Sequence, residues 1–343
     1  MKTVSVIIPT YNVEKYIATA VFSVLNQTHE NFELLIVDDG SPDRSVEICQ
    51  HFTDPRIKII RQKNRGLAGA RNTGIRYAKG EYLAFLDGDD FWEPEMLAKN
   101  IAHLESSPEV GVSFNRSAFV DREGNPLGTY TMPQLNNIDL VCLLRGSPIG
   151  NGSAVVIKRE VFEAIRFQDN LYGTVEDFYF DDNFRQSEDI ECWLRIILQT
   201  PWKIVGIPDV LTCYRVNTGG LSANFIKQFA SWEKVFEKTR SYAPEKVAPL
   251  ENMARAYQLR YLARSAVRMR VGDAAVQLIN RSLSTYWQIV LEEPKRTILT
   301  VVAAYLLRFL PQFIYHKIDA LAANKVGKTQ KQQIIQQQSQ QLV

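Results

Sequence analysis

Five short apolar segments recur in the first 115 residues, and each is separated from the next by a stretch with helical signals. They are residues 4–8, 33–37, 57–60, 82–86 and 110–114. A strand that faces water on one side alternates apolar and polar residues. These segments do not alternate, which predicts strands covered on both faces. Strands and helices that follow one another in this way predict an α/β fold with a parallel sheet.

Helical signals fill the gaps between these segments. Apolar residues recur on one face between residues 17 and 25, which predicts a helix there. A second helix is expected to begin with Ser41 as its N-cap and Pro42 in its first position. A third covers residues 66–78, a stretch that contains three glycines.

Polar motifs follow three of the predicted strands at the point where each strand ends. Residues 9–12 (PTYN) follow the first strand, residues 38–41 (DDGS) the second, and residues 87–90 (DGDD) the fourth. Open α/β sheets bind their ligands at the carboxyl ends of the strands. The sequence therefore predicts one site to which all three motifs contribute.

Three carboxylates are crowded into the third motif, namely Asp87, Asp89 and Asp90. Like charges this close repel one another unless a cation lies among them. Carboxylate oxygens suit a hard cation, Mg²⁺ or Mn²⁺, which typically also binds the phosphates of a substrate. The alternative is that the acids favour the N-terminus of the next helix, near Glu93 and Glu95, a role for which Asp90 alone would suffice.

A second acidic group lies in residues 187–195 (SEDIECWLR), where a helix is predicted to begin near Asp189. A carboxylate held by a packed helix can take a proton from an attacking hydroxyl. The alternative is that Glu188, Asp189 and Glu191 complement the helix dipole.

The glycines argue against one common class of α/β enzyme. The turn after the first strand holds residues 11–14 (YNVE), where a dinucleotide-binding fold requires GxGxxG, so a dehydrogenase is disfavoured. Gly66, Gly69 and Gly74 permit close backbone approach in a later segment, and Arg71 there could reach a phosphate. The same glycines also fit a helix packed tightly against the sheet.

Composition divides the chain into two parts. The 343 residues suffice for two domains or one large domain with an extension, and 45% are hydrophobic, which is enough for a core. Lys and Arg outnumber Asp and Glu by 18 to 8 from Lys227 onward, whereas the preceding part has 22 against 30. The two parts are therefore expected to face different partners.

Cysteine spacing and hydropathy suggest a location. The four cysteines are far apart without a CxxC pair, so we expect reduced thiols in the cytoplasm and neither a zinc site nor a disulfide framework. The apolar run at the start is too short for a signal peptide. No uncharged apolar run reaches 18 residues, so no clear transmembrane span is expected.

The basic part has a helical texture. Residues 257–283 read as two helices joined near Gly272, resembling one tetratricopeptide hairpin, and their arginines are expected to form a solvated face. Residues 297–315 show a narrow polar stripe on an otherwise apolar helix, which fits core packing or a membrane interface. We therefore expect four regions: residues 1–225, a helical region at 226–290, an amphipathic and possible membrane-associating helix at 291–328, and a disordered Gln-rich tail at 329–343.

Four motifs in this order resemble the family 2 glycosyltransferases of GT-A fold. They are VSVIIPTYN, LLIVDDGSPD, NRGLAGARNTGIRYAKGEYLAFLDGDD and SEDIECWLR, and the resemblance covers roughly residues 3–215. It implies transfer of a sugar, with inversion and a divalent metal, from a nucleotide-diphosphate donor to an acceptor hydroxyl. UDP is the commonest nucleotide in the family, and the implied acceptor is a glycan or a lipid-linked precursor of a cell-surface polysaccharide. Such an enzyme would work in the cytoplasm, with peripheral contact at the inner face of the plasma membrane.

The resemblance also implies roles for individual residues. Asp189 would be the catalytic base, Asp89 the metal ligand, and Asp87 would face the ribose or a metal-bound water. Asp38 would support the turn after the first strand. The remaining positions would hold the donor: Pro9, Thr10, Tyr11 and Asp39 around the base and ribose, and Arg71 and Asn72 along its pocket.

Two departures and three alternatives accompany this interpretation. Asn217 stands where many relatives have a His, with Arg215 and Ser222 as possible substitutes, and the QxxRW motif of processive synthases is absent. A sugar nucleotidyltransferase would need an early glycine-rich loop. A degenerate sugar-nucleotide-binding protein would not need its aspartates intact. A nucleic-acid binder would need a basic platform with interleaved aromatic residues, and no such motif is present.

Overall fold

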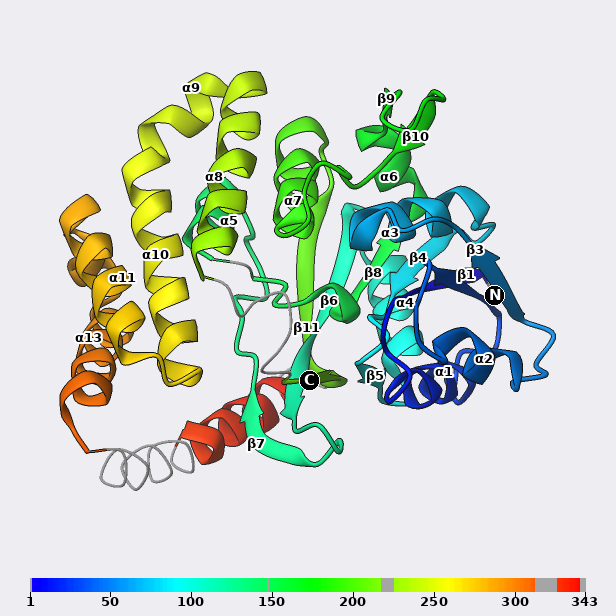
Figure 1. The fold of residues 1–343 in the computed structure, drawn as a ribbon, viewed down its shortest axis with the longest axis horizontal. Helices are drawn as coiled ribbons and strands as arrows, with labels where there is room; N and C mark the ends of the chain where they lie inside the picture. The colour runs from blue at the N-terminus through cyan, green and yellow to red at the C-terminus, as the bar shows by residue number, and fades with distance from the viewer. Residues whose placement is uncertain (1, 147, 217–224, 312–325, 340–343) are drawn as a thin grey trace. The chain divides into compact units, whose positions relative to one another are not determined.

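The computed structural model describes residues 2–146, 148–216, 225–311 and 326–339, and these form two compact units (Figure 1). The first unit comprises Met1–Ile138, Pro148–Val216 and Gln330–Val343. The second comprises Asp139–Ser147 and Asn217–Thr329.

The first unit is built on a mixed sheet whose strands run in the order β3-β2-β1-β4-β8-β6-β11-β5, with β7 paired to β6. Its strands are β1 (Val4–Thr10), β2 (Phe32–Asp38), β3 (Ile57–Arg61), β4 (Tyr82–Phe85), β5 (Phe91–Trp92), β6 (Val110–Val120), β7 (Pro126–Tyr130), β8 (Val155–Lys158) and β11 (Lys203–Arg215). A separate hairpin pairs β9 (Phe167–Asp169) with β10 (Glu176–Phe178). The five apolar segments predicted to be strands are all confirmed.

The sheet is mostly parallel, with antiparallel insertions that the sequence pattern did not predict. β1 pairs in parallel with both β2 and β4, and β2 pairs in parallel with β3. β8 lies antiparallel between β4 and β6, and β5 is antiparallel to β11. The expected GT-A sheet, mostly parallel, is therefore confirmed, with β5 and β8 as antiparallel exceptions. β8 has only four residues, and an apolar run that short does not reveal its direction.

Helices cover both faces of this sheet. They are α1 (Ile17–Leu25), α2 (Ser45–Gln50), α3 (Gly66–Tyr77), α4 (Met96–Ser106), α6 (Arg159–Ile165) and α7 (Glu188–Gln199), with a short 3₁₀ helix η1 (Gly152–Ala154) before β8. Val4, Val6 and Ile8 of β1 share one core cluster with the buried faces of α1 and α4. The opposite face of the sheet carries α3, whose Gly74 lies so close to Ile7 that an added Cβ would be 2.4 Å from its side chain.

The start of α2 differs from the prediction. α2 begins at Ser45, four residues after Ser41. The Ser41 hydroxyl instead donates to Asp43 at 2.6 Å, and its backbone N–H donates to Asp38 at 2.9 Å. Asp43 also accepts from the backbone N–H of Ser45 at 3.1 Å. Ser41 therefore belongs to the turn after β2, because Asp38 accepts from its backbone N–H and Asp43 from its hydroxyl.

The second unit is helical. Its helices are α5 (Leu140–Arg145), α8 (Phe225–Tyr242), α9 (Pro244–Val247), α10 (Glu251–Arg268), α11 (Gly272–Thr285), α12 (Ile289–Glu292) and α13 (Pro294–Phe309), with the 3₁₀ helix η3 (Ala248–Leu250). α10 and α11 form the predicted helical hairpin, and α13 packs on both through a small cluster: Ala263, Ala266, Ala275, Ile279 and Ala304.

One arginine of α10 does not follow the expectation of a solvated face. Arg260 is buried and donates to the Thr297 hydroxyl at 2.8 Å, and it also pairs with Glu293. A buried guanidinium needs such partners to offset the loss of water. Arg264 and Arg268 are exposed, as predicted.

The C-terminal segments also differ from their predictions. α13 ends at Phe309, shortly before Pro311, which cannot continue a helix. Residues 326–339 are helical, so the described part of the predicted disordered tail is ordered. Its glutamines find partners in the first unit: the Gln330 side chain bonds to the backbone of Tyr130, and Gln337 bonds to the buried Arg116. Composition alone cannot reveal such partners. Among the described residues, no helix is long and apolar enough to cross a membrane.

Candidate active site

Three neighbouring strands bring the predicted motifs to one edge of the sheet. β1 lies between β2 and β4, and its last residue, Thr10, stands opposite Asp38, the last residue of β2. β4 ends at Phe85, two residues before Asp87. The prediction that these motifs meet at the carboxyl ends of parallel strands is confirmed.

The first motif presents one aromatic ring to solvent. Pro9 and Thr10 are buried within β1, and the Thr10 hydroxyl donates to the carbonyl of Ile8 at 3.2 Å. Tyr11 is 50% exposed. Asn12 follows in the left-handed region (φ 56°), and its backbone N–H donates to the Ser41 hydroxyl at 2.8 Å. The turn therefore holds Tyr11 outward, where its ring is open to a ligand.

Asp39 organises the next loop. Its carboxylate is 3% exposed and accepts hydrogen bonds from the side chain of Gln62 (2.7 Å) and from the backbone N–H groups of Arg65 (2.7 Å) and Gly66 (2.8 Å). Burial raises the pKa of Asp39, although these hydrogen bonds oppose the shift. The structure thus places Asp39 at the start of α3, with its oxygens engaged by the protein. Asp38 shapes the neighbouring turn through Ser41.

The three crowded aspartates have three different environments. Asp87 pairs with Arg71 at 2.9 Å. Asp90 is buried and accepts from the Ser153 hydroxyl (2.7 Å) and from the backbone N–H of Arg215 (2.9 Å). Asp89 is partly exposed. Burial and the charges of Asp89 and Asp87 raise the pKa of Asp90 well above its usual range. Crowding is therefore relieved by one cation, Arg71, and by the raised pKa of Asp90, which favours its neutral form.

Asp90 does not cap the following helix. α4 begins at Met96, and its N-cap is Glu95. The alternative that explained Asp90 as a helix cap is therefore wrong. Both of its carboxylate oxygens are used to join the loop after β4 to β11 and η1.

Arg71 is the centre of the site. Its guanidinium is 2% exposed and pairs with Glu188 as well as Asp87, each at 2.9 Å. Burial alone would lower the pKa of Arg71, but the charges of Asp87, Glu188 and Asp189 outweigh it and raise the pKa. One side chain of α3 thus connects the loop after β4 with the start of α7.

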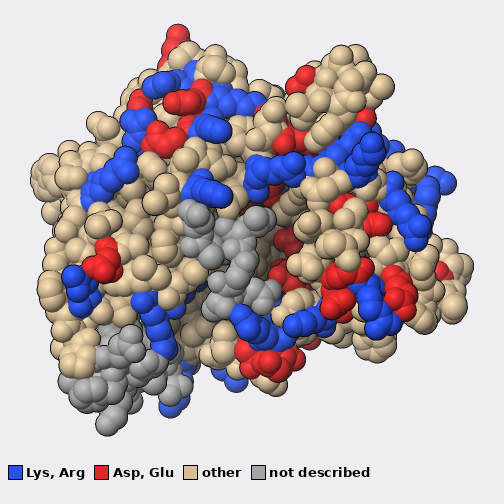
Figure 2. Space-filling view, viewed as in Figure 1, with Lys and Arg blue, Asp and Glu red and all other residues tan. Residues whose placement is uncertain are grey.

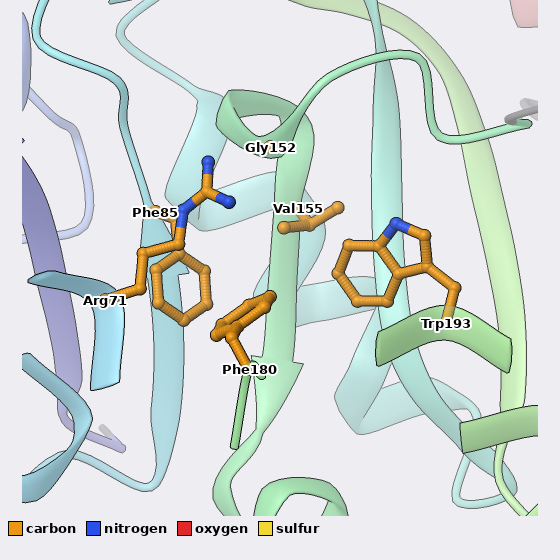
Figure 3. A pocket seen from close by; sticks show the side chains of 6 residues that line it. All are labelled: Arg71, Phe85, Gly152, Val155, Phe180 and Trp193. Carbon is orange, nitrogen blue, oxygen red and sulfur yellow. The ribbon is translucent and has the colours of Figure 1, made fainter. Parts of the chain in front are cut away.

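A packed apolar floor holds this guanidinium (Figure 3). Arg71 lies against Phe180 at 5.4 Å from the ring centre, and Phe85, Val155 and Trp193 continue the floor. The start of η1, at Gly152, approaches from the other side. A Cβ there would lie 2.4 Å from an Arg71 nitrogen, so a residue without a side chain is needed at this position.

Asp189 lies at the beginning of α7, next to Glu188. It is partly buried, and its carboxylate accepts from the backbone N–H of Ile190 at 2.8 Å. Burial raises the pKa of Asp189; Arg71 opposes this shift and the charge of Asp87 adds to it. Burial and the charge of Asp189 raise the pKa of Glu188 to about 7. Asp189 therefore belongs to the same electrostatic cluster as Asp87 and Arg71.

The dipole of α7 does not suffice to explain its three acids. Glu188 pairs with Arg71, and the fully buried Glu191 pairs with Arg195 at 2.7 Å. Each of these two glutamates has a specific cation. Among the described residues, Asp189 is the acid of this group for which no ion pair is observed.

Asn72 lies behind the site. It is fully buried, and its amide donates to Asp182 (2.6 Å) and to the Phe180 carbonyl (2.7 Å) while accepting from the backbone N–H groups of Tyr179 and Phe180. Burial raises the pKa of Asp182 to about 6. The Asn72 amide therefore holds residues 179–182 in place through hydrogen bonds. A contact between Asn72 and the donor stays a prediction.

Arg215 and Ser153 were not assigned their roles from the sequence. The Arg215 side chain donates to the carbonyls of Asp89 (2.8 Å), Asp121 (3.1 Å) and Arg122 (2.6 Å), so it holds the Asp89 loop. Ser153 donates to Asp90 and accepts from the backbone N–H of Asp87 at 3.1 Å. No sequence signal marks Ser153. Asn217 and Ser222 lie outside the described residues.

The donor set around Asp89 fits a hard divalent cation. Asp87 and Asp89 offer carboxylate oxygens at the same loop, whereas Asp90 is consumed by internal hydrogen bonds. Among the described residues, no three His, Cys, Asp or Glu side chains gather as a metal cluster. Two carboxylates completed by the phosphates of a ligand are, however, a usual environment for Mg²⁺.

Solved structures show the class of fold. The chain is similar to Staphylococcus aureus TarS 1–349 in complex with UDP-GlcNAc (TM-score 0.53, 18% identity, 96% of this chain and 91% of that chain). It is also similar to the mannosyltransferase PcManGT from Pyrobaculum calidifontis in complex with GDP-Man and Mn²⁺ (TM-score 0.54, 22% identity, 88% and 86%). The fold is that of the GT-A glycosyltransferases.

Sequence comparison gives the family. The family described as "Glycosyl transferase family 2" matches residues 5–166. An uncharacterized glycosyltransferase of Haemophilus influenzae is 36% identical over 183 residues, which cover 52% of this chain and 70% of the relative. The Escherichia coli protein UDP-Glc:alpha-D-GlcNAc-diphosphoundecaprenol beta-1,3-glucosyltransferase WfaP is 32% identical over 69% of this chain and 86% of its own length. The chain belongs to glycosyltransferase family 2 and is a glycosyltransferase.

Proposed function

We propose that the protein transfers a sugar from a UDP-sugar to an acceptor hydroxyl with inversion, using a divalent metal. The observation that carries the proposal is the double ion pair of Arg71. It fixes Asp87, a proposed metal and donor residue, and the helix start that bears Asp189, the proposed base, in one cluster. A donor bound beside Asp87 and an acceptor bound beside Asp189 would be held in line for the attack. Such alignment supplies a large part of the rate enhancement in catalysis.

The donor would be held by the segments that follow β1, β2 and β4. The exposed ring of Tyr11 can stack on the base, while Asp39 keeps the peptide at Arg65 and Gly66 in place for the donor. Asp89 and Asp87 would hold Mg²⁺ or Mn²⁺, which supplies positive charge for the departing nucleoside diphosphate.

Asp189 would act on the acceptor. A carboxylate takes a proton most effectively when its pKa lies near the working pH, and burial moves the pKa of Asp189 in that direction. Removal of the hydroxyl proton would let that oxygen form a bond to the anomeric carbon from the face opposite the departing diphosphate. The configuration at that carbon would then be inverted.

Relatives support a class of acceptor. WfaP, and WfgD of Escherichia coli at 31% identity over 81% of its length, are named as glucosyltransferases that act on a diphosphoundecaprenol-linked sugar. By this likeness, the proposed acceptor is a lipid-linked or related glycan in cell-surface polysaccharide biosynthesis. The proposed location is the cytoplasmic side of the plasma membrane, which also suits four free cysteines.

A screen of nucleotide sugars tests the proposal. The full chain is incubated with UDP-, GDP- and dTDP-sugars in Mn²⁺, Mg²⁺ or chelator, and the released nucleoside diphosphate is measured. We expect metal-dependent release from at least one UDP-sugar. Release that is equal in chelator would contradict the metal, and no release or binding of any nucleotide sugar would contradict the function.

The metal ligand is tested by calorimetry. Asp89→Ala should remove the dependence of UDP-sugar affinity on Mn²⁺, because a second oxygen ligand from the same loop cannot hold the ion alone. Asp54→Asn, a change in a loop before β3, is the control and should leave that dependence intact. Unchanged Mn²⁺-dependent affinity in Asp89→Ala would exclude Asp89 as a ligand.

A further inference from the structure

Helix α13 buries the polar side of its sequence and exposes the apolar side. Thr297, Thr300 and Ala304 are at most 4% exposed. Five exposed side chains are instead large and apolar, and they define the α13 apolar face: Ile298, Leu299, Val302, Tyr305 and Phe309, which are 37–72% exposed. A surface helix of a globular protein normally has the opposite arrangement, and grouped apolar side chains of this kind mark an interaction surface.

Buried hydrogen bonds fix this orientation. The Thr297 hydroxyl accepts from the buried Arg260 at 2.8 Å and lies within hydrogen-bonding distance of the carbonyls of Glu293 (2.8 Å) and Ile289 (3.1 Å). Rotation of α13 about its axis to bury its apolar side would leave Arg260 in the interior without this partner, which is costly. The apolar face is therefore a fixed property of the helical unit.

Cations outnumber acids beside the α13 apolar face, although Glu293 pairs with Arg296 and Asp273 with Arg308. α13 contains no Asp or Glu, and exposed Lys295 and Arg296 stand in its first turn, where the helix dipole disfavours cations. Desolvation by neighbouring side chains, and then the charges of Arg296, Arg268 and Arg260, lower the pKa of Arg264 to about 10, and these charges act on Arg264 because the guanidinium groups lie near it. On the side of the helical unit visible in Figure 2, basic side chains also cover more of the surface than acidic ones.

We propose that the α13 apolar face lies in the interface of a lipid bilayer that contains anionic lipids. A helix of 16 residues is about 24 Å long, which suits a helix lying along the surface. Apolar side chains would enter the boundary between headgroups and acyl chains, and Lys295 and Arg296 would meet anionic headgroups. A second copy of the chain is a poorer occupant, because two such faces bring like charges together. The proposal needs no assumption about the donor or the metal.

The test is co-sedimentation of the full chain with phosphatidylcholine vesicles, with and without phosphatidylglycerol. We expect stronger binding when phosphatidylglycerol is present. A Val302→Ser/Phe309→Ser variant should bind about tenfold or more weakly, because two apolar side chains no longer enter the interface. Both residues are exposed, so folding should be unaffected, which circular dichroism checks. The matched control is Phe22→Ser, an aromatic residue of α1 that is 63% exposed.

A second pair of variants separates charge from apolar contact. Lys295→Gln and Arg296→Gln should each weaken binding to phosphatidylglycerol vesicles about fivefold and leave binding to phosphatidylcholine vesicles unchanged. Equal losses on both kinds of vesicle would contradict the role of charge.

Three results would overturn the proposal. They are a wild-type chain that stays in the supernatant with every vesicle, a Phe22→Ser variant that loses as much binding as the double variant, and concentration-dependent dimerisation that the double variant abolishes. The last result would show that a second copy covers the face. Binding is measured without nucleotide sugar, so failure of the proposed transferase reaction leaves this test intact.

Discussion

Two regions of the first unit each carry three acids within four residues, and the acids of the two regions have corresponding environments. One is the loop after β4, and the other is the first turn of α7. In each region one acid is buried with its own partners, namely Asp90 and Glu191. In each, one acid pairs with Arg71, namely Asp87 and Glu188. In each, the third is partly exposed, namely Asp89 and Asp189.

The difference between the regions lies in the backbone that carries them. The acids after β4 belong to a loop whose carbonyl at Asp89 is held by Arg215, an arrangement that suits metal and phosphate. Those of α7 belong to a helix start, and the Asp189 carboxylate accepts from the N–H of Ile190, which suits a fixed base. Similar composition therefore supports two chemical tasks, and Arg71 couples them.

The largest expected effect distinguishes the two partly exposed acids. Asp189→Asn should lower turnover by about 10²-fold or more, since a general base typically contributes 10²–10⁴, while UDP-sugar affinity stays near the wild-type value. Turnover is measured by release of UDP in the presence of acceptor, and affinity by calorimetry. Asp54→Asn again serves as control. Wild-type turnover in Asp189→Asn would exclude Asp189 as the base. Asp89 and Asp189 could then not be assigned the two different roles.

The second prediction concerns the residue that couples the regions. Arg71→Met should lower the free energy of unfolding by about 3–5 kcal/mol, because it leaves the Asp87 and Glu188 carboxylates without their buried cation. Urea denaturation measures this change.

The matched control for Arg71→Met is Arg44→Met. Arg44 pairs with Glu47 at 2.8 Å on the surface, where both side chains are largely exposed, so its removal should not change stability measurably. If the two variants were equally stable, Arg71 would not hold the regions together.

Local patterns in the sequence predicted the regions, but the contacts between them could not be predicted. Apolar runs placed the ends of β1, β2 and β4 to within two residues, because strand and turn preferences act over a few residues. Arg71 and Glu188 are 117 residues apart, and nothing in either segment identifies the other. The same holds for Gln330 and Tyr130, 200 residues apart, which is why a Gln-rich segment was expected to be disordered.

Buried polar residues were the other source of error. The sequence grouped Asp90 with its neighbours, since spacing cannot show that Ser153 and the Arg215 backbone take both of its oxygens. Arg260 was placed on a solvated face because its spacing matches the exposed Arg264 and Arg268, yet it reaches Thr297 of α13. In both cases tertiary contacts decide the burial, and those contacts come from other elements of the chain.

A smaller effect is expected from crowding Arg71 without removing it. In Gly152→Ala, the new methyl group would lie 2.4 Å from an Arg71 nitrogen. The guanidinium must move and weaken its ion pairs, so stability should fall by about 1–3 kcal/mol. The control is Gly146→Ala, where nothing lies within 4 Å of the added Cβ. Equal urea midpoints for the two variants would show that the site tolerates movement of Arg71.

The smallest effect is a dependence of stability on pH near neutrality, to which Glu188 should contribute. Burial, with the charge of Asp189, raises the pKa of Glu188 from 4.5 to about 7, so the folded state holds a proton that the unfolded state has lost. This contribution to stability is complete below about pH 4.5 and disappears as the pH rises to about 7. Relative to Glu188→Gln, the free energy of unfolding of the wild type should therefore fall by about 1–3 kcal/mol across that interval. Denaturation at several pH values measures the difference between the two proteins. A constant difference would mean that Arg71 keeps Glu188 ionised throughout.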